Sequence, residues 1–358
     1  SSTEADEPYV LRCWEPNVGE DLDELVEVVD GQSVDTLIIQ FNYGFFNFDK
    51  LAIFIEHQLN AGKIVVLFMH ATIDPESDPN KRLLRLKSVL VRCHRILVHT
   101  VSDMNRLKAL GLVDNVTLFP QGIVDYAPPL KDTKAAKLRL LLAGYSAVLQ
   151  SLIGQKKKFT IASYGFFLPH KGLLELIESI SLLHQSGKKV HLKMFNAEYP
   201  AEKSATLIHQ AKEYITFLGL DDWILLSTEY LPDDESMTLL GEADLIVYPY
   251  QLTNESSSAA VRHGLASGKP VAVSPIAIFD DVASAVLRLP GHTPSLIAQG
   301  ISEVIDAIGN DSENIRDRKR EAEKWCAAHR YPILGNRLYG MLYGISRAKY
   351  ATELSDSD

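Results

Sequence analysis

The stretch LTNESSSAAVRHGLASGKPVAV, residues 252–273, carries the signals of a helix followed by a buried strand. Glu255 and three serines precede an apolar run with helical spacing, and Gly268 and Pro270 are typical of a helix end. The apolar, β-branched run PVAV then predicts a strand. A helix that ends just before a strand is the repeating unit of a parallel α/β sheet, so this stretch favours that fold. The carboxylate and serines either only cap the helix or also hold a ligand with phosphates and hydroxyls.

The same alternation of short apolar strands and helices extends over most of the chain. Residues 35–122 show it first, and it starts again at Phe159. Residues 125–157 interrupt it with Pro- and Lys-rich segments, which indicate a connection between domains. We therefore expect an α/β protein with two Rossmann-like, doubly wound parallel-sheet domains that face a cleft. The predicted domains are residues 1–150, residues 151–335, and a last helix with an acidic tail at residues 336–358.

Composition limits the classes of function and the cellular compartments that we expect for the chain. A formal net charge of −10 argues against a nucleic-acid-binding protein, because such proteins bind phosphates through basic surfaces. The three cysteines, Cys13, Cys93 and Cys326, lack the spacings of a zinc site and fit a reducing compartment. No apolar run approaches the ~18 residues of a membrane-spanning helix, and the polar, acidic start is unlike a signal peptide. We therefore expect a cytoplasmic protein.

Parallel sheets bind ligands beyond the carboxyl ends of their strands, so the residues that follow each strand are the candidates. In ASYGFFLPHKG, Gly165 follows a predicted strand and allows a close approach of the backbone. Lys171 lies at the start of the next helix, where the helix dipole disfavours a cation. An anion bound between the helix and the lysine would resolve this conflict, and a solvated lysine is the alternative.

The helix of the opening stretch offers a second set of groups. Asn254 or Glu255 is expected to cap it, and Ser256, Ser257 and Ser258 are expected to supply hydroxyls and backbone N–H groups in its first turn. Glu255 can also accept hydrogen bonds from sugar hydroxyls. The alternative is a serine-rich cap without a ligand.

The first half of the chain contains one candidate histidine. His70 follows the buried strand IVVLFM, and a neutral histidine there can donate or accept a hydrogen bond near pH 7, or be satisfied by the backbone alone. Ser102 is the expected N-cap of a helix that ends at Gly111. Residues 80–94 predict an amphipathic helix with a basic face, which suits either solvent or contact with an anionic membrane surface.

Several segments resemble one known family. YGFFLPHKG, EADLIVYPYQLTNESSS and RHGLASGKPVAVS, in this order and spacing, resemble the C-terminal half of family-four retaining glycosyltransferases of the GT-B architecture. FMHAT, RILVHTVSDMNRL and NVTLFPQGI resemble the N-terminal half. KWCAAHRYPILGNRLYGMLYGI resembles the segment that crosses back onto the first domain. The resemblance extends over roughly residues 35–345 and looks like a branch found in surface-polysaccharide assembly.

The resemblance implies a nucleotide-sugar donor held mainly by the C-terminal domain and a glycan or lipid-linked acceptor met mainly by the N-terminal domain. It also implies retention at the anomeric carbon, with no cofactor and no required metal. The implied catalytic residues are Glu255, which would hold the donor sugar, and His70, which would lie beside the sugar and the acceptor. Lys171 would face the donor diphosphate. The implied donor-binding residues are Gly165, Lys171, Tyr230, Asn254, Ser256, Ser257, Ser258, Arg262 and His263.

The chain also departs from the family pattern. His263 stands where the family has a second glutamate for the nucleotide ribose, and Phe166 stands where it usually has an arginine for the diphosphate. Arg262 is a candidate to replace that charge. The usual first strand and Gly-rich loop are missing, so we expect a shortened N-terminal domain, from a trimmed larger polypeptide or a shortened branch. The alternatives are a catalytically silent GT-B module that binds a nucleotide or glycan within a larger polysaccharide-synthesis protein, or a GT-B epimerase or phosphorylase.

Overall fold

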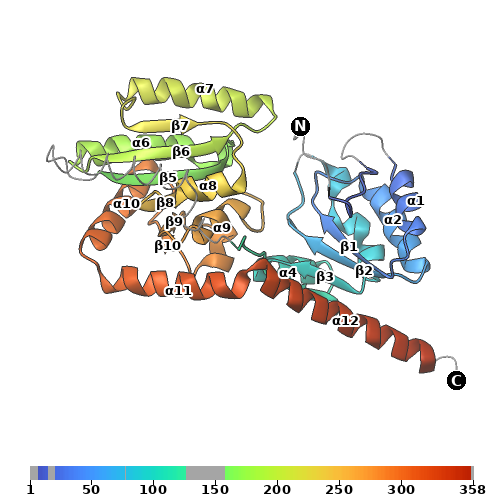
Figure 1. The fold of residues 1–358 in the computed structure, drawn as a ribbon. Coiled ribbons are helices and arrows are strands. Elements are labelled where there is room, and N and C mark those ends of the chain that lie inside the picture. Colours follow the sequence, from blue (N-terminus) through green and yellow to red (C-terminus); the bar gives the residue numbers. More distant parts are fainter. Residues whose placement is uncertain (1–6, 15–20, 77, 126–157, 356–358) are drawn as a thin grey trace. The chain divides into compact units, whose positions relative to one another are not determined.

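The structure, a computed structural model, describes residues 7–14, 21–76, 78–125 and 158–355. The chain forms two compact units. Unit 1 comprises Ser1–Pro120, Asn254–Ser257 and Gly335–Asp358, and unit 2 comprises Gln121–Thr253 and Ser258–Leu334. Each unit contains one parallel sheet with its helices, as Figure 1 shows. The expected two parallel-sheet domains are therefore confirmed, while the boundary expected at residue 150 lies outside the described residues.

Unit 1 contains a four-stranded parallel sheet whose strands follow one another in chain order, β1-β2-β3-β4. Every residue of β2 is buried, as its entirely apolar sequence predicts for a strand covered on both faces. No described helix, including the long α12, is sufficiently apolar over a sufficient length to span a membrane. The elements are α1 (Asp23–Gly31), β1 (Thr36–Phe41), α2 (Phe48–Asn60), β2 (Ile64–Met69), η1 (Pro79–Lys81), η2 (Leu83–Leu86), α3 (Lys87–Leu90), β3 (Arg95–Val98), α4 (Val101–Ala109), β4 (Val116–Leu118) and α12 (Tyr331–Ser355), which starts in unit 2.

The continuous basic helix expected at residues 80–94 is wrong. The segment instead forms two short 3-10 turns and the four-residue helix α3. The backbone N–H of Leu83 donates to the carboxylate of Asp74 at 2.9 Å, and the ammonium of Lys81 donates to the carbonyl of Tyr43 at 2.6 Å. Because the side chain of Asp74, 9 positions before Leu83, takes a backbone donor that a helix would use, the helix does not propagate. The expected contact with an anionic membrane surface therefore has no continuous helical face behind it and stays a prediction.

Helix α4 is capped by Thr100 and not by Ser102 as expected. The hydroxyl of Thr100 accepts the N–H of Asp103, and the carboxylate of Asp103 accepts the N–H of Thr100, both at 3.1 Å. Asp103 is fully buried and also accepts hydrogen bonds from Thr72 and Arg106. Burial alone would raise the pKa of Asp103, but these hydrogen bonds outweigh it and lower the pKa.

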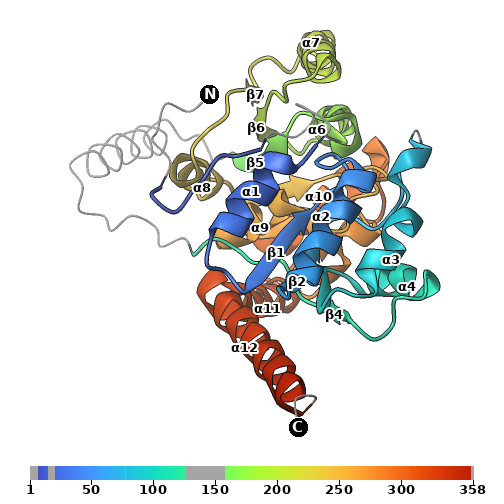
Figure 2. The same cartoon turned by 90° about the vertical axis from the view of Figure 1, so that its right-hand side faces the viewer.

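Unit 2 contains a six-stranded parallel sheet in the order β10-β9-β8-β5-β6-β7. The first strand of the unit, β5, lies inside the sheet between β6 and β8, and the chain adds strands outward in both directions (Figures 1 and 2). The switch point of this doubly wound sheet therefore lies between β5 and β8. The elements are β5 (Phe159–Phe166), η3 (Pro169–Lys171), α6 (Leu173–Gln185), β6 (Val190–Ala197), α7 (Glu202–Phe217), β7 (Ile224–Ser227), α8 (Asp233–Leu240), β8 (Leu245–Tyr248), α9 (Ala259–Ala266), β9 (Val271–Val273), η4 (Ala277–Val282), β10 (Leu287–Arg288), α10 (Pro294–Gly309) and α11 (Glu313–His329).

Helices cover both faces of this sheet. Leu245 and Val247 of β8 pack with α6, α7 and α10 in one cluster, whereas Ile246 and Tyr248 pack with α8, α9 and α11 in another. Alternate residues of a strand point to opposite faces, so a fully apolar strand such as β8 is buried on both sides.

Gly172 brings the turn after β5 against the residues after β8. Its φ of 66° lies in the left-handed region, and a Cβ built there would lie 1.9 Å from the carbonyl oxygen of Pro249. Only glycine allows this backbone approach, which places Lys171 at the switch point.

We predict that Gly172→Ala destabilises the protein by about 3 kcal/mol or more, because it adds a backbone clash to the cost of a left-handed conformation. Gly219→Ala is the matched control, since Gly219 has a φ of 65° and nothing within 4 Å of its built Cβ. The control should cost about 1–2 kcal/mol. Chemical denaturation measures both, and equal losses would contradict the proposed clash.

Candidate functional site

The site residues predicted from the sequence divide between the two units. Asn254, Glu255, Ser256, Ser257 and His70 belong to unit 1. The others belong to unit 2, and they are Gly165, Lys171, Tyr230, Ser258, Arg262 and His263.

Three side chains of unit 2 come together at the switch point of its sheet. Lys171 is 8% exposed, and its ammonium lies 4.1 Å from the ring centre of Tyr250, a cation–π contact. The hydroxyl of Tyr250 lies 3.2 Å from the hydroxyl of Ser258. Gly165 has a φ of 123°, and a Cβ there would lie 3.2 Å from Ala260, so the missing side chain lets α9 lie close to β5.

The opening stretch begins its helix later than the sequence indicated. Ser258 is the N-cap of α9 and accepts the N–H of Val261 at 3.4 Å, so the caps expected at Asn254 or Glu255 are wrong. Ser256 and Ser257 precede the helix and do not form its first turn. The short side chain of a serine places its hydroxyl within reach of the first backbone N–H groups of a helix, and here Ser258, the last serine of the run, is the cap.

Sequence reasoning missed Tyr250. The only signal for this residue is its place two positions beyond the buried strand β8. An apolar ring after a strand usually indicates core packing, and its contact with Lys171 depends on the neighbouring strand β5 being beside β8.

An exposed aromatic cluster lies at the carboxyl edge of β5, β6 and β7. The ring of Phe166 lies 5.3 Å from Tyr199 in an edge contact and 6.2 Å from Tyr230 in a stacked one. Their exposed fractions are 37% for Phe166, 41% for Tyr199 and 73% for Tyr230. Exposed rings held in mutual contact provide a flat apolar surface of the kind on which a nucleobase stacks.

His263 has a carboxylate beside it. Its Nε2 lies 3.2 Å from Asp233, the first residue of α8, and its ring lies 5.0 Å from the ring of Tyr164. A carboxylate of a neighbouring element of unit 2 therefore lies beside position 263.

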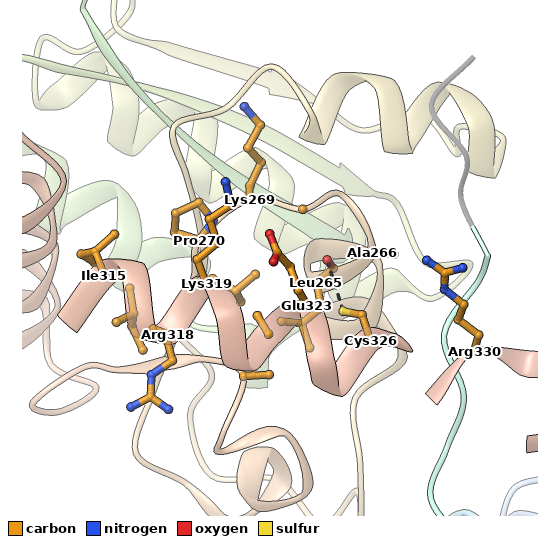
Figure 3. Close-up of a pocket in the computed structure, with 15 residues that line it drawn as sticks. Leu265, Ala266, Lys269, Pro270, Ile315, Arg318, Lys319, Glu323, Cys326 and Arg330 are labelled. Carbon is orange, nitrogen blue, oxygen red and sulfur yellow. Dashed lines mark hydrogen bonds between the residues drawn. The ribbon is translucent and has the colours of Figure 1, made fainter. Parts of the chain in front are cut away.

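Unit 2 also contains a cavity of about 190 Å³ between the end of α9, β9 and α11 (Figure 3). Its lining is mainly apolar and includes Leu265, Val271 and Ala322, with Lys269 and Lys319 among its charged members. No predicted site residue lines this cavity. In the described ranges of the chain, no group of three or more His, Cys, Asp or Glu side chains is arranged to hold a metal ion.

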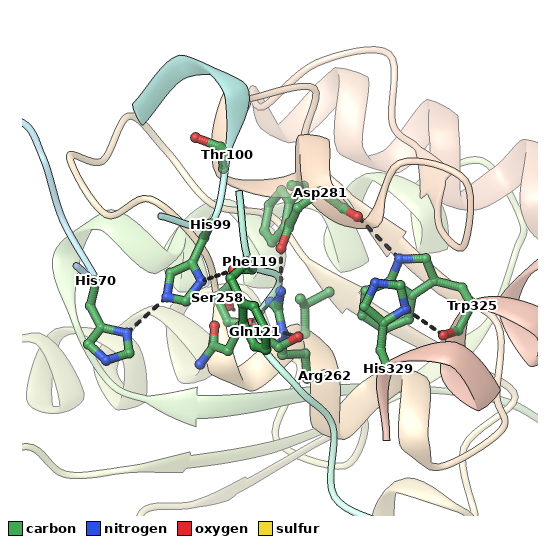
Figure 4. Close-up of polar contacts among 12 residues, drawn as sticks. His70, His99, Thr100, Phe119, Gln121, Ser258, Arg262, Asp281, Trp325 and His329 are labelled. Atoms are coloured by element: carbon green, nitrogen blue, oxygen red, sulfur yellow. Dashed lines mark hydrogen bonds and ion pairs between the residues drawn. The ribbon is translucent and has the colours of Figure 1, made fainter. Parts of the chain in front are cut away.

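Arg262 is 3% exposed, and its guanidinium is engaged inside unit 2. It donates to the carbonyls of Gln121 at 3.2 Å and Ser258 at 2.8 Å, and it pairs with the carboxylate of Asp281 (Figure 4). Burial raises the pKa of Asp281 in spite of this partner. These contacts hold α9 in place within unit 2, so the guanidinium of Arg262 is not part of the proposed donor site.

In unit 1, the segment that carries Glu255 is anchored by its neighbour. Ser256 is 4% exposed and donates a hydrogen bond of 2.7 Å to the buried carboxylate of Asp103. Asn254 and Glu255 are exposed. The anchor therefore fixes the backbone beside Glu255 and leaves its side chain at the surface.

His70 belongs to a chain of hydrogen bonds in unit 1. Its Nδ1 lies 3.0 Å from Nε2 of His99, whose Nδ1 lies 3.1 Å from the carbonyl oxygen of Phe119 (Figure 4). Its Nε2 lies 2.7 Å from the amide oxygen Oε1 of Gln40. Burial lowers the pKa of His70. His99 was missed, although each histidine directly follows one of two neighbouring strands that end in register, Met69 opposite Val98.

No family model and no curated protein matches the chain, whereas solved structures do. A glycosyltransferase from Rickettsia africae is 14% identical with a TM-score of 0.67, over 90% of this chain and 80% of that one. Anabaena HepE in complex with UDP is 13% identical with a TM-score of 0.69, over 90% and 82%. Sucrose-phosphate synthase from Thermosynechococcus elongatus is 12% identical with a TM-score of 0.68, over 91% and 78%. At these identities the likeness shows the fold, which is the GT-B architecture.

Proposed function

We propose that this chain, which has the GT-B fold, is a glycosyltransferase that moves a sugar from a nucleotide-sugar donor to a glycan or lipid-linked saccharide. The observation that carries the proposal is the meeting of Lys171, Tyr250 and Ser258 at the switch point of the sheet in unit 2. Doubly wound sheets bind ligands at this point, and a lysine beside a capped helix N-terminus suits phosphate groups. The likeness to structures named as glycosyltransferases supports the choice of reaction.

The finer parts of the proposal follow from the sequence resemblance. We propose retention at the anomeric carbon, no cofactor, no required metal, and a role in cell-surface polysaccharide synthesis at the cytoplasmic face of the membrane. Lys171 and the N–H groups at the start of α9 would stabilise the departing diphosphate, and such electrostatic stabilisation supplies most of the catalysis in a site of this kind. Glu255 would hold the transferred sugar, and His70 would contact the acceptor side.

The aromatic cluster and the pair of His263 with Asp233 complete the proposed donor site. The cluster would stack on the nucleobase, and Asp233 would supply the acceptor oxygens for the ribose hydroxyls. Both belong to unit 2, as do the proposed diphosphate-binding residues.

We predict that Tyr230→Ala weakens nucleotide binding about 10-fold, since stacking on an aromatic side chain contributes about 1–3 kcal/mol per base. Phe217→Ala is the matched control, because Phe217 is 82% exposed in the same unit and lies outside the cluster. Calorimetric titration with the nucleotide measures both. An equal affinity of the two variants would exclude the cluster from base binding.

A thermal-shift panel with UDP, GDP, dTDP, ADP and CMP, each with and without EDTA, tests the proposed function. A ligand that binds only the folded state raises the melting temperature by mass action. UDP is the first candidate, because one of the similar structures holds it. One nucleotide that stands out, unaffected by EDTA, supports a metal-independent transferase and identifies the donor base. No response from any of them counts against the proposal.

The second candidate is a catalytically silent module that binds a nucleotide or glycan within a larger polysaccharide-synthesis protein. Phe166 and His263 favour it, because they replace an arginine and a glutamate of the family pattern. Nucleotide binding without sugar transfer to any offered acceptor would support this candidate over the enzyme.

A further inference from the structure

We infer that His99 is a positioning residue that holds His70 as its Nδ1–H tautomer, so that Nε2 of His70 accepts a hydrogen bond from a substrate hydroxyl. The identity of that hydroxyl as one of a saccharide rests on the proposed function. The three hydrogen bonds from which the tautomer follows join residues of unit 1.

His99 carries its ring hydrogen on Nδ1. Its side chain is 2% exposed, and its Nδ1 lies 3.1 Å from the carbonyl oxygen of Phe119. A carbonyl only accepts, so Nδ1 of His99 carries the hydrogen. In a neutral ring the other nitrogen, Nε2, then carries a lone pair that can accept a hydrogen bond.

His70 also carries its ring hydrogen on Nδ1 and donates it to His99. The lone pair of His99 Nε2 lies 3.0 Å from Nδ1 of His70. Two bare nitrogens at this distance would repel each other, so Nδ1 of His70 carries the hydrogen and donates it to His99. Phe68 stacks on the ring of His70, with ring centres 5.7 Å apart and planes 10° apart, and keeps the ring in this orientation.

Nε2 of His70, the ring nitrogen that does not contact His99, has no hydrogen in this tautomer. With the hydrogen on Nδ1, Nε2 is a bare acceptor that requires a donor. The amide oxygen Oε1 of Gln40 lies 2.7 Å away, and an oxygen cannot satisfy a bare nitrogen. A half-turn of the amide exchanges its oxygen and nitrogen at the same place, and the NH₂ group then donates to Nε2. Gln40 is an exposed residue at the carboxyl end of β1, so its side chain can yield this place to a ligand.

The positions of the ring hydrogens determine which ligand groups Nε2 of His70 can bind. Nε2 of neutral His70 can accept from a hydroxyl, but it repels a phosphate or carboxylate oxygen, which carries lone pairs only. A saccharide hydroxyl therefore fits this position, and a diphosphate does not. Since the hydrogen bond of one ring nitrogen sets the tautomer of a histidine, His99 controls what His70 can bind.

The test measures the tautomer directly. ¹⁵N NMR of the ring nitrogens, assigned by the loss of signals in His70→Gln, should show protonated Nδ1 and bare Nε2 for His70 in the unmodified chain. His99→Phe keeps a buried ring without an acceptor and should move the hydrogen of His70 to Nε2. His99→Gln can donate to Phe119 and accept from His70, so it should keep the original tautomer. Protonated Nε2 in the unmodified chain, or no change in His99→Phe, would overturn the inference.

The kinetic readout separates this inference from the proposed function. His99→Phe should lower kcat/KM for sugar transfer roughly 10²-fold, the order expected for a misplaced acid–base group, whereas His99→Gln should stay within a few-fold. Nucleotide thermal shifts should be unchanged in both variants, because the residues proposed to bind the base, the ribose and the diphosphate lie in unit 2. His57→Phe, at an exposed histidine of the same unit, is the matched control and should keep full activity. If the unmodified chain transfers no sugar, the proposed function fails and the NMR result still decides the tautomer.

Discussion

Glu255→Ala should reduce sugar transfer by about 10²- to 10³-fold, the loss that follows removal of one group aimed at a transition state. In the proposed site the carboxylate would accept hydrogen bonds from hydroxyls of the donor sugar and so position that sugar for transfer. Glu255 is exposed, whereas its neighbour Ser256 anchors the segment on Asp103. The variant should therefore keep its melting temperature and its affinity for the nucleotide. The measurement is initial-rate transfer from the sugar donor of the nucleotide identified by thermal shift.

Three comparisons make this result specific. Glu255→Gln keeps the size of the side chain and removes its charge, so it should lose most of the activity as well. Glu303→Ala removes a surface glutamate of α10 and should have no effect. Ser256→Ala removes the anchor and should lower stability as well as activity, which distinguishes a displaced segment from a missing carboxylate. Normal turnover by Glu255→Ala would show that the assigned role is wrong.

Lys171→Met should weaken the binding of a nucleoside diphosphate about 10- to 100-fold, since hydrogen bonds to charged groups contribute about 1.5–3 kcal/mol each. The ammonium is held over the ring of Tyr250 at the switch point, so its position requires little reorganisation when the ligand binds. The same variant should bind the nucleoside without phosphates as tightly as the unmodified chain does. Calorimetric titration with both ligands measures the difference.

Tyr250→Phe is the matched control for Lys171. It keeps the ring beneath the ammonium and removes only the hydroxyl that contacts Ser258, so diphosphate affinity should fall less than in Lys171→Met. Lys171→Arg keeps the charge and should retain part of the affinity. Equal losses for the diphosphate and the bare nucleoside would assign Lys171 to the folding of unit 2 and not to the phosphates.

Local sequence patterns determined the elements of the fold. The apolar run of β2 indicated a buried strand, and the glycines after α4 and α9 indicated where those helices end. The alternation of strands and helices was sufficient to predict two parallel sheets. These features depend on residues within a few positions of one another, which is the range over which periodicity, capping and backbone sterics act.

Side-chain partners were decided by the tertiary structure. Asp74 takes the backbone donor of Leu83 and ends the helix expected at residues 80–94. Asp281 pairs with the buried Arg262, although the sequence made that arginine a candidate for the donor phosphates.

The contacts of the proposed site have the same origin. Lys171 and Tyr250 meet because β5 and β8 are neighbours in the sheet of unit 2, and His70 and His99 meet because β2 and β3 end in register. Positions far apart in the chain become neighbours only when the sheet forms. Sequence patterns therefore determined which residues follow the strands, and strand order and register determined which of those residues meet.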